Sequence, residues 1–226
     1  MTVTVLAATW GIGWALLVVF LLLLFVTYVV VQGTRAQLEW RRQVQRGNLD
    51  VIQTLVREEV ERWKRDRPPK GVPPDVWRGV QNVELMEVGV DYLRASTTAE
   101  AQFRIVDGQR REVSSALDEA MKVTVQLADM FLYDIPHVRP DRVQIDVYTT
   151  FRTEAGETRQ ECILSTVVRR QDVIDLDWEA PAPEIIRAMG GRYQLDMAGR
   201  PLPITPDTET VRNGRGPLPP RERQQA

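Results

Sequence analysis

Residues 142–170, RVQIDVYTTFRTEAGETRQECILSTVVRR, decide the fold. Apolar and polar side chains alternate over 142–152 and again over 159–170, which is typical of β-strands that bury one face. The tetrapeptide EAGE at 154–157 joins the two runs and is suited to a turn, so the stretch predicts a β-hairpin. The side chains predicted to point into the core are Val143, Ile145, Val147 and Phe151 on the first strand and Cys162, Leu164, Thr166 and Val168 on the second.

The residues before this hairpin predict one long helix, over about 113–134. Ser114 or Ser115 is placed to cap its start, because serine oxygens accept hydrogen bonds from the first free amides of a helix. Asp118 and Glu119 follow in the first turn, where the helix dipole favours acidic side chains. An apolar stripe at helical spacing is suited to packing on a sheet, and it comprises Leu117, Ala120, Met121, Thr124, Leu127, Ala128 and Phe131.

Alternation over about 82–95 and 99–107 predicts another hairpin before the helix. Two hairpins around one helix give the order β-β-α-β-β, most simply a largely antiparallel sheet with the helix on one face. The sequence therefore predicts a two-layer α+β domain over residues 80–178, and we expect a short strand at its end, over 173–178.

Helical and proline-rich segments flank this domain. Asn48 is a candidate N-cap for an amphipathic helix over 49–66, which we interpret as packing on its own domain because two heptads are too few to indicate a coiled-coil stalk. The prolines of 68–79 predict an extended linker. After the domain we expect a short helix within 179–199, and residues 200–226, rich in Pro, Gly and Arg, predict a disordered tail.

Residues 3–31 form a run of 29 residues without a charged side chain. As a helix this run would be roughly 40 Å long, more than the ~30 Å apolar core of a bilayer, so residues 1–34 predict a transmembrane anchor and 35–67 juxtamembrane helices. A cleaved signal peptide is the alternative, but its apolar core is shorter, roughly 7 to 15 residues, and follows basic residues. The side chains expected at the membrane interfaces are Trp10, Trp14, Tyr28, Arg35, Arg41, Arg42 and Arg46.

The charges around this run predict its orientation. Arginines beside a membrane segment stay on the cytoplasmic side, so we expect the N-terminus outside and the domain in the cytoplasm. The single cysteine, Cys162, cannot form an internal disulfide, which agrees with a reducing compartment. The strong preference for Arg over Lys is typical of a GC-rich bacterial genome, so the expected location is a bacterial cell membrane.

The sequence contains no catalytic, cofactor-binding or metal-binding motif, and we expect no cofactor. The only histidine, His137, lies between Asp134 and Asp141, so a membrane-anchored enzyme with a pocket near His137 is the alternative function. Cys162 faces the predicted core, where a free cysteine behaves as a small apolar side chain. The acidic residues of 172–179 lack the glycine and spacing of a calcium loop. A net charge of −2 excludes a strongly basic nucleic-acid-binding protein.

The sheet face opposite the helix is the candidate interaction surface. A solvated face should be polar at every second position, and most of its positions are. Tyr148, Ile163 and Val167 interrupt it and predict an apolar patch that needs a cover. We therefore expect a non-enzymatic, single-pass membrane protein whose cytoplasmic α+β domain is an interaction or assembly module. Its expected partners are the lipid bilayer and a protein partner or a second copy, as in an accessory subunit of a membrane complex.

Overall fold

The computed structural model describes Leu17, Val44, Arg212 and residues 19–28, 47–106, 108–152 and 156–207. The chain divides into two units, Met1–Gly47 and Asn48–Ala226. In the first unit Leu17 and residues 19–28 are helical, and Tyr28 is exposed. No helix within the described residues has both the length and the apolar character needed to cross a bilayer. Most of the predicted anchor lies outside the described residues, as do Trp10, Trp14, Arg35, Arg41, Arg42 and Arg46.

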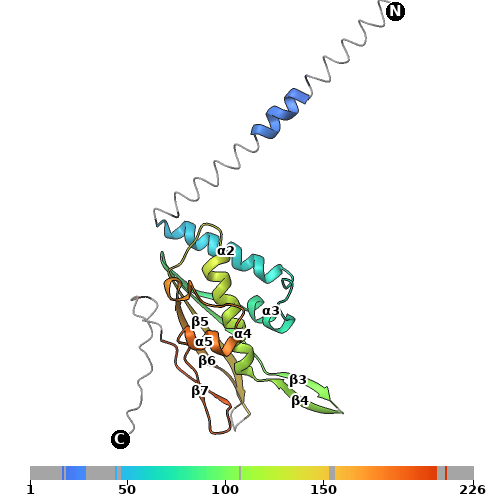
Figure 1. The fold of residues 1–226 in the computed structure, drawn as a ribbon, viewed down its shortest axis with the longest axis vertical. Helices are drawn as coiled ribbons and strands as arrows, with labels where there is room; N and C mark the ends of the chain where they lie inside the picture. Colours follow the sequence, from blue (N-terminus) through green and yellow to red (C-terminus); the bar gives the residue numbers. More distant parts are fainter. Residues whose placement is uncertain are drawn as a thin grey trace, which may run out of the picture. The chain divides into compact units, whose positions relative to one another are not determined.

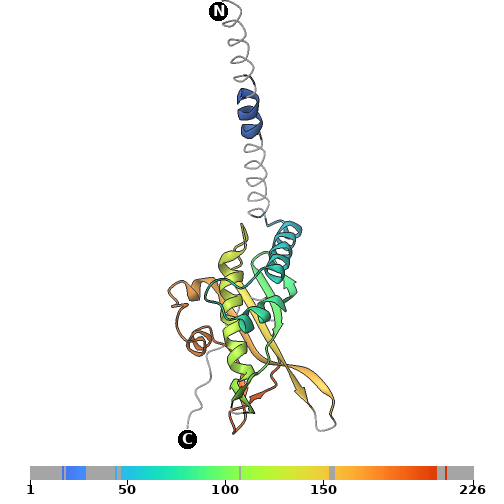
Figure 2. The same ribbon diagram turned by 90° about the vertical axis from the view of Figure 1, so that its right-hand side faces the viewer.

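The second unit has an α+β fold with a mixed four-stranded sheet, which confirms the predicted class (Figures 1 and 2). The strands lie in the order β1-β2-β5-β6. The two outer pairs are antiparallel, but the central strands β2 and β5 run parallel. The prediction of a largely antiparallel sheet is wrong at its centre, because the chain returns from β2 to β5 through a long crossover that contains a helix. The strand bounds are β1 Glu84–Val88, β2 Tyr92–Thr98, β5 Arg142–Arg152 and β6 Thr158–Arg169.

The hairpin predicted over 82–95 and 99–107 is wrong, because this region forms two hairpins. The chain turns back within the first predicted strand, where the Gly89 amide donates to the Tyr92 carbonyl at 2.8 Å, and this turn separates β1 from β2. The second predicted strand belongs to β3 (Gln102–Val106), which pairs with β4 (Gln109–Ser114). These two strands form a sheet of their own, and Figure 1 shows it extending away from the rest of the unit.

The main helix is α4 (Ala116–Asp129), and a π-helical turn, η1 (Met130–Asp134), continues it. It begins with a capping box: the Asp118 amide donates to Ser115 Oγ at 3.1 Å, and the Ser115 amide donates to the Asp118 carboxylate at 3.2 Å. It starts later than predicted because β4 continues to Ser114. It packs on β5 and β6 and also on α3 and α5, and its buried apolar residues include Leu117, Ala120, Met121, Val123, Leu127 and Ala128.

Two helices before the sheet belong to the same unit. The first, α2 (Leu49–Arg65), is capped by Asn48 as predicted, and Trp63 packs edge-on against Phe131 with ring centroids 5.2 Å apart. This contact confirms that the helix packs on its own domain. The second, α3 (Pro74–Gln81), occupies part of the predicted extended linker, because a proline at the first position is compatible with a helix start.

The chain after β6 also differs from the prediction. Residues 173–178 do not form a strand; Val173 ends a 3-10 turn, η2 (Arg170–Val173), and the residues after it are in turns and irregular structure. The expected short helix is present as α5 (Ala182–Ala188). In the predicted disordered tail, β8 (Pro201–Leu202) pairs with β7 (Gln194–Leu195), so the described part of that segment is structured.

Candidate interaction surfaces

The sheet face opposite α4 carries the predicted patch, but the structure buries most of it. Ile163 is fully buried, Val167 is 9% exposed and Tyr148 is half-buried. These side chains are therefore covered within the chain itself. The unpaired apolar surface that the sequence predicted here is largely absent from the described part of the fold.

A β-bulge at this patch changes the expected alternation. Val147 pairs with Leu164, whereas Tyr148 pairs with Cys162, so β6 has one extra residue, Ile163. Cys162 therefore lies opposite Tyr148. The sequence predicted that Cys162 continues the row of Leu164, and the bulge makes this prediction wrong. Burial, followed by the nearby carboxylate of Asp146, raises the pKa of Cys162 to about 12. The thiol is therefore protonated at neutral pH and is a poor nucleophile.

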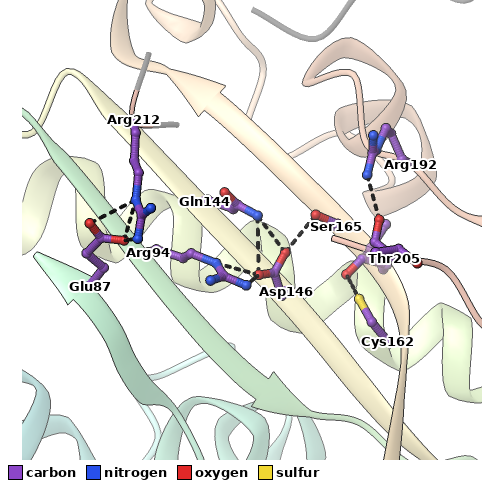
Figure 3. A network of polar contacts seen from close by, with 10 residues as sticks. Glu87, Arg94, Gln144, Asp146, Cys162, Ser165, Arg192, Thr205 and Arg212 are labelled. Atoms are coloured by element: carbon purple, nitrogen blue, oxygen red, sulfur yellow. Dashed lines mark hydrogen bonds and ion pairs between the residues drawn. The ribbon is translucent and has the colours of Figure 1, made fainter. Parts of the chain in front are cut away.

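A buried polar cluster lies on the neighbouring strands β2, β5 and β6 (Figure 3), where its member Gln144 pairs with Val167 of the patch. The carboxylate of Asp146 accepts hydrogen bonds from Arg94 Nε at 2.9 Å, Gln144 Nε2 at 3.0 Å and Ser165 Oγ at 2.6 Å. Asp146 and Gln144 are fully buried. Because the carboxylate is held by a cation and two neutral donors, this arrangement stabilises a fixed ion and gives the cluster a structural role.

The C-terminal segment is bound at both edges of the sheet. At the β6 edge, Ser165 and Arg192 exchange backbone hydrogen bonds of 3.0 and 2.9 Å, and the Ile204 amide donates to the Cys162 carbonyl at 2.8 Å. At the β1 edge, Arg212 Nη2 and Nε lie 2.7 and 2.9 Å from Glu87 Oε2 (Figure 3). The hydrogen bonds from Arg212, and then that from the Tyr92 hydroxyl, lower the pKa of Glu87.

The β3–β4 hairpin is an exposed apolar feature of the second unit that the sequence analysis missed. The exposed fractions are 80% for Ile105, 44% for Phe103 and 52% for Val113. The Arg110 guanidinium lies over the Phe103 ring, 4.0 Å from its centroid. An Asp-Gly pair at 107–108, flanked by alternating residues, is a strong hairpin signal and could have identified this element.

An acidic segment lies at 172–179 and begins within η2. Its four acidic side chains, Asp172, Asp175, Asp177 and Glu179, are exposed, and Ile174 among them is 68% exposed. Within the described residues no group of three or more potential ligands could hold a metal ion. The segment is therefore an acidic surface with an apolar side chain at its centre.

The histidine proposed for the alternative function has no catalytic geometry. His137, Asp134 and Asp141 are all exposed. His137 has a φ of 67° and forms no hydrogen bond or ion pair with another described residue. Partial desolvation raises the pKa of Asp134, and Arg62 opposes this shift. The structure does not bring the three side chains together.

Similarity to known proteins gives no assignment. No family model, curated protein or solved structure matches the chain. The candidate interaction features are the exposed hairpin, the acidic segment, and the sheet edges to which the C-terminal segment binds.

Proposed function

We propose that this protein is a single-pass membrane protein whose unit from Asn48 onward is a non-catalytic interaction or assembly module, an accessory subunit of a membrane complex. The β3–β4 hairpin carries this proposal. It pairs with no other strand in the described chain, and an isolated two-stranded sheet is only marginally stable in water. Its exposed Phe103, Ile105 and Val113 are the kind of apolar surface that a protein partner covers.

The proposed anchor rests on the sequence. Residues 3–31 carry no charge, and a basic segment with Arg35, Arg41, Arg42 and Arg46 follows them. Such a run is long enough to span a bilayer, and the arginines favour an orientation with the N-terminus outside and the α+β unit in the cytoplasm. The lipid bilayer is then the first partner of the protein.

The settings of three described side chains, Asp146, Cys162 and His137, are compatible with a non-catalytic role. Asp146 is paired with Arg94, Cys162 is a buried protonated thiol, and His137 forms no hydrogen bond or ion pair with another described residue. Nucleic acid is an unsuitable partner because the net charge is −2.

Affinity purification of the tagged full-length chain from native membranes in mild detergent tests the assembly role. We expect a stoichiometric partner, or a multiple of the chain's own mass. A strictly monomeric, partner-free particle would contradict the proposal. An untagged strain controls for adventitious binding.

Cysteine labelling tests the anchor and its orientation. The buried thiol of Cys162 gives a low background. Thr2→Cys should react in intact cells with a membrane-impermeant maleimide, whereas the matched variant Gln225→Cys should react only after lysis. The reverse pattern, or release of the chain by an alkaline wash of the membranes, would count against the proposed topology.

A further inference from the structure

The β3–β4 hairpin carries three arginines as well as apolar side chains, and Glu112 is its one acidic residue among those described. Arg104, Arg110 and Arg111 are exposed, and none of them forms an ion pair with another described residue. Arg104 and Arg111 lie directly opposite each other across the two strands. Like charges in this position repel, so the isolated hairpin is electrostatically unfavourable. An acidic partner would remove this repulsion.

The opposite face of the hairpin supplies the apolar contact. Phe103 pairs with Glu112 and Ile105 pairs with Arg110, so Phe103 and Ile105 share one face. The guanidinium of Arg110 lies over the Phe103 ring and extends the positive charge to this face as well. The complementary surface would be acidic around an exposed apolar side chain.

Residues 172–179 have this composition. Asp172, Asp175, Asp177 and Glu179 are exposed, and none forms an ion pair with a described residue. Ile174, 68% exposed, lies among them. The segment therefore complements the hairpin: its charge is of the opposite sign, and each surface carries an exposed apolar side chain.

The hairpin and the acidic segment lie at opposite ends of the sheet. The starts of β2 and β5 and the end of β6 are aligned, because Tyr92 pairs with Arg142 and Arg142 pairs with Arg169. The acidic segment follows Arg169, whereas the hairpin follows the other end of β2, at Thr98. Seven strand residues at about 3.3 Å each separate the two ends by roughly 20 Å. The hairpin of one chain is therefore placed to meet the segment of another chain.

We infer that the β3–β4 hairpin docks on residues 172–179 of a second copy of this chain, so that the protein associates with itself head to tail. This inference rests on the proposed assembly role and names its partner. The two surfaces differ, so the contact is heterologous and generates a ring or an open row of copies. Because exposed charges contribute, association weakens as salt rises.

Light scattering after size-exclusion chromatography of the full-length chain in mild detergent tests the inference. The hairpin variant Arg104→Glu/Arg111→Glu and the segment variant Asp172→Arg/Asp175→Arg should each weaken self-association by about tenfold or more, because attractive pairs become repulsive. Their equimolar mixture should restore association, since each variant then meets a surface of opposite charge. The matched control Arg57→Glu/Arg67→Glu, on exposed residues elsewhere, should associate as the unaltered chain does.

The outcomes separate this inference from the proposed function. Unchanged association of both variants, or no recovery in the mixture, overturns the head-to-tail contact and leaves another assembly surface in place. A monomer that co-purifies with a different stoichiometric protein overturns self-association but supports an accessory subunit. A monomer without any partner from native membranes overturns both. Circular dichroism of each variant establishes that a loss of association is not a loss of fold.

Discussion

The guanidinium of Arg94 on β2 holds the fully buried carboxylate of Asp146 on β5, with Nε 2.9 Å and Nη2 2.8 Å from the same oxygen. This ion pair joins the two central parallel strands. Arg94→Leu leaves a buried charge without its cation and should lower the free energy of unfolding by about 3 to 5 kcal/mol. Denaturant unfolding measures this loss.

The double variant Arg94→Leu/Asp146→Leu serves as the control for this prediction. It removes both charges, so part of the stability should return. A single Arg94 variant within about 0.5 kcal/mol of the unaltered chain would show that the pair does not hold the strands together.

The pKa of Glu87 shows whether Arg212 of the C-terminal segment is bound to β1. Its pKa is lowered first by Arg212 and then by Tyr92, so its contribution to stability is present above the ordinary glutamate value and is lost as the pH falls through the lower folded value. Arg212→Ala should move the Glu87 pKa back toward normal, and adding Tyr92→Phe should complete the return. A 13C NMR titration measures both steps. If the titration midpoint of Glu87 is the same in the Arg212→Ala variant as in the unaltered chain, the ion pair is contradicted.

The contribution of Glu59 to the stability of the fold should have the opposite pH dependence. It is 5% exposed, and burial raises its pKa despite the nearby Arg62. A raised carboxyl pKa means that ionisation destabilises the folded state, and this cost disappears as the pH falls through the folded value toward the unfolded one. Glu59→Gln should therefore stabilise the fold at pH 7, with a gain that fades near pH 4. The exposed neighbour Glu58→Gln is the control, and equal effects of the two variants would refute the role of burial.

A substitution at Gly79 tests how closely α3 packs on α4. A Cβ at this position would lie 2.5 Å from a methyl carbon of Val123, so Gly79→Ala should cost about 1 to 3 kcal/mol through overpacking. Val123→Ala in the same chain opens the space and should recover part of that loss. Thermal unfolding of both variants gives the comparison. If Gly79→Ala is neutral, α3 does not pack as closely as described.

Local sequence signals predicted the elements whose tertiary setting agreed with them. The alternation over 142–170 gave β5 and β6 within a residue or two, and Asn48 and Ser115 cap their helices as expected. The bulge at Ile163 could not be predicted, because an unbroken alternation hides the one-residue shift that pairs Tyr148 with Cys162.

Two kinds of feature could not be predicted from the sequence. Some segments carry local signals that fit more than one structure, and other features depend on contacts between residues far apart in the sequence. Pro73 and Pro74 indicated an extended linker, but a proline at the start of a helix is equally acceptable. Asp107 and Gly108 indicated a turn after the strand expected over 99–107, but not that this turn joins the two strands of the hairpin that became the candidate docking surface. The burial of Ile163 and Val167 depends on the fold around the sheet, which alternation alone does not reveal.

Photo-cross-linking from position 105 in native membranes tests the central claim most directly. A photoreactive amino acid replaces Ile105 in the full-length chain, and the same residue at the exposed Met197 serves as the control. Head-to-tail docking predicts a product of twice the chain's mass whose cross-linked peptide contains residues 172–179, and no such product from position 197. Cross-links from position 105 to lipid alone, or no product, would contradict it.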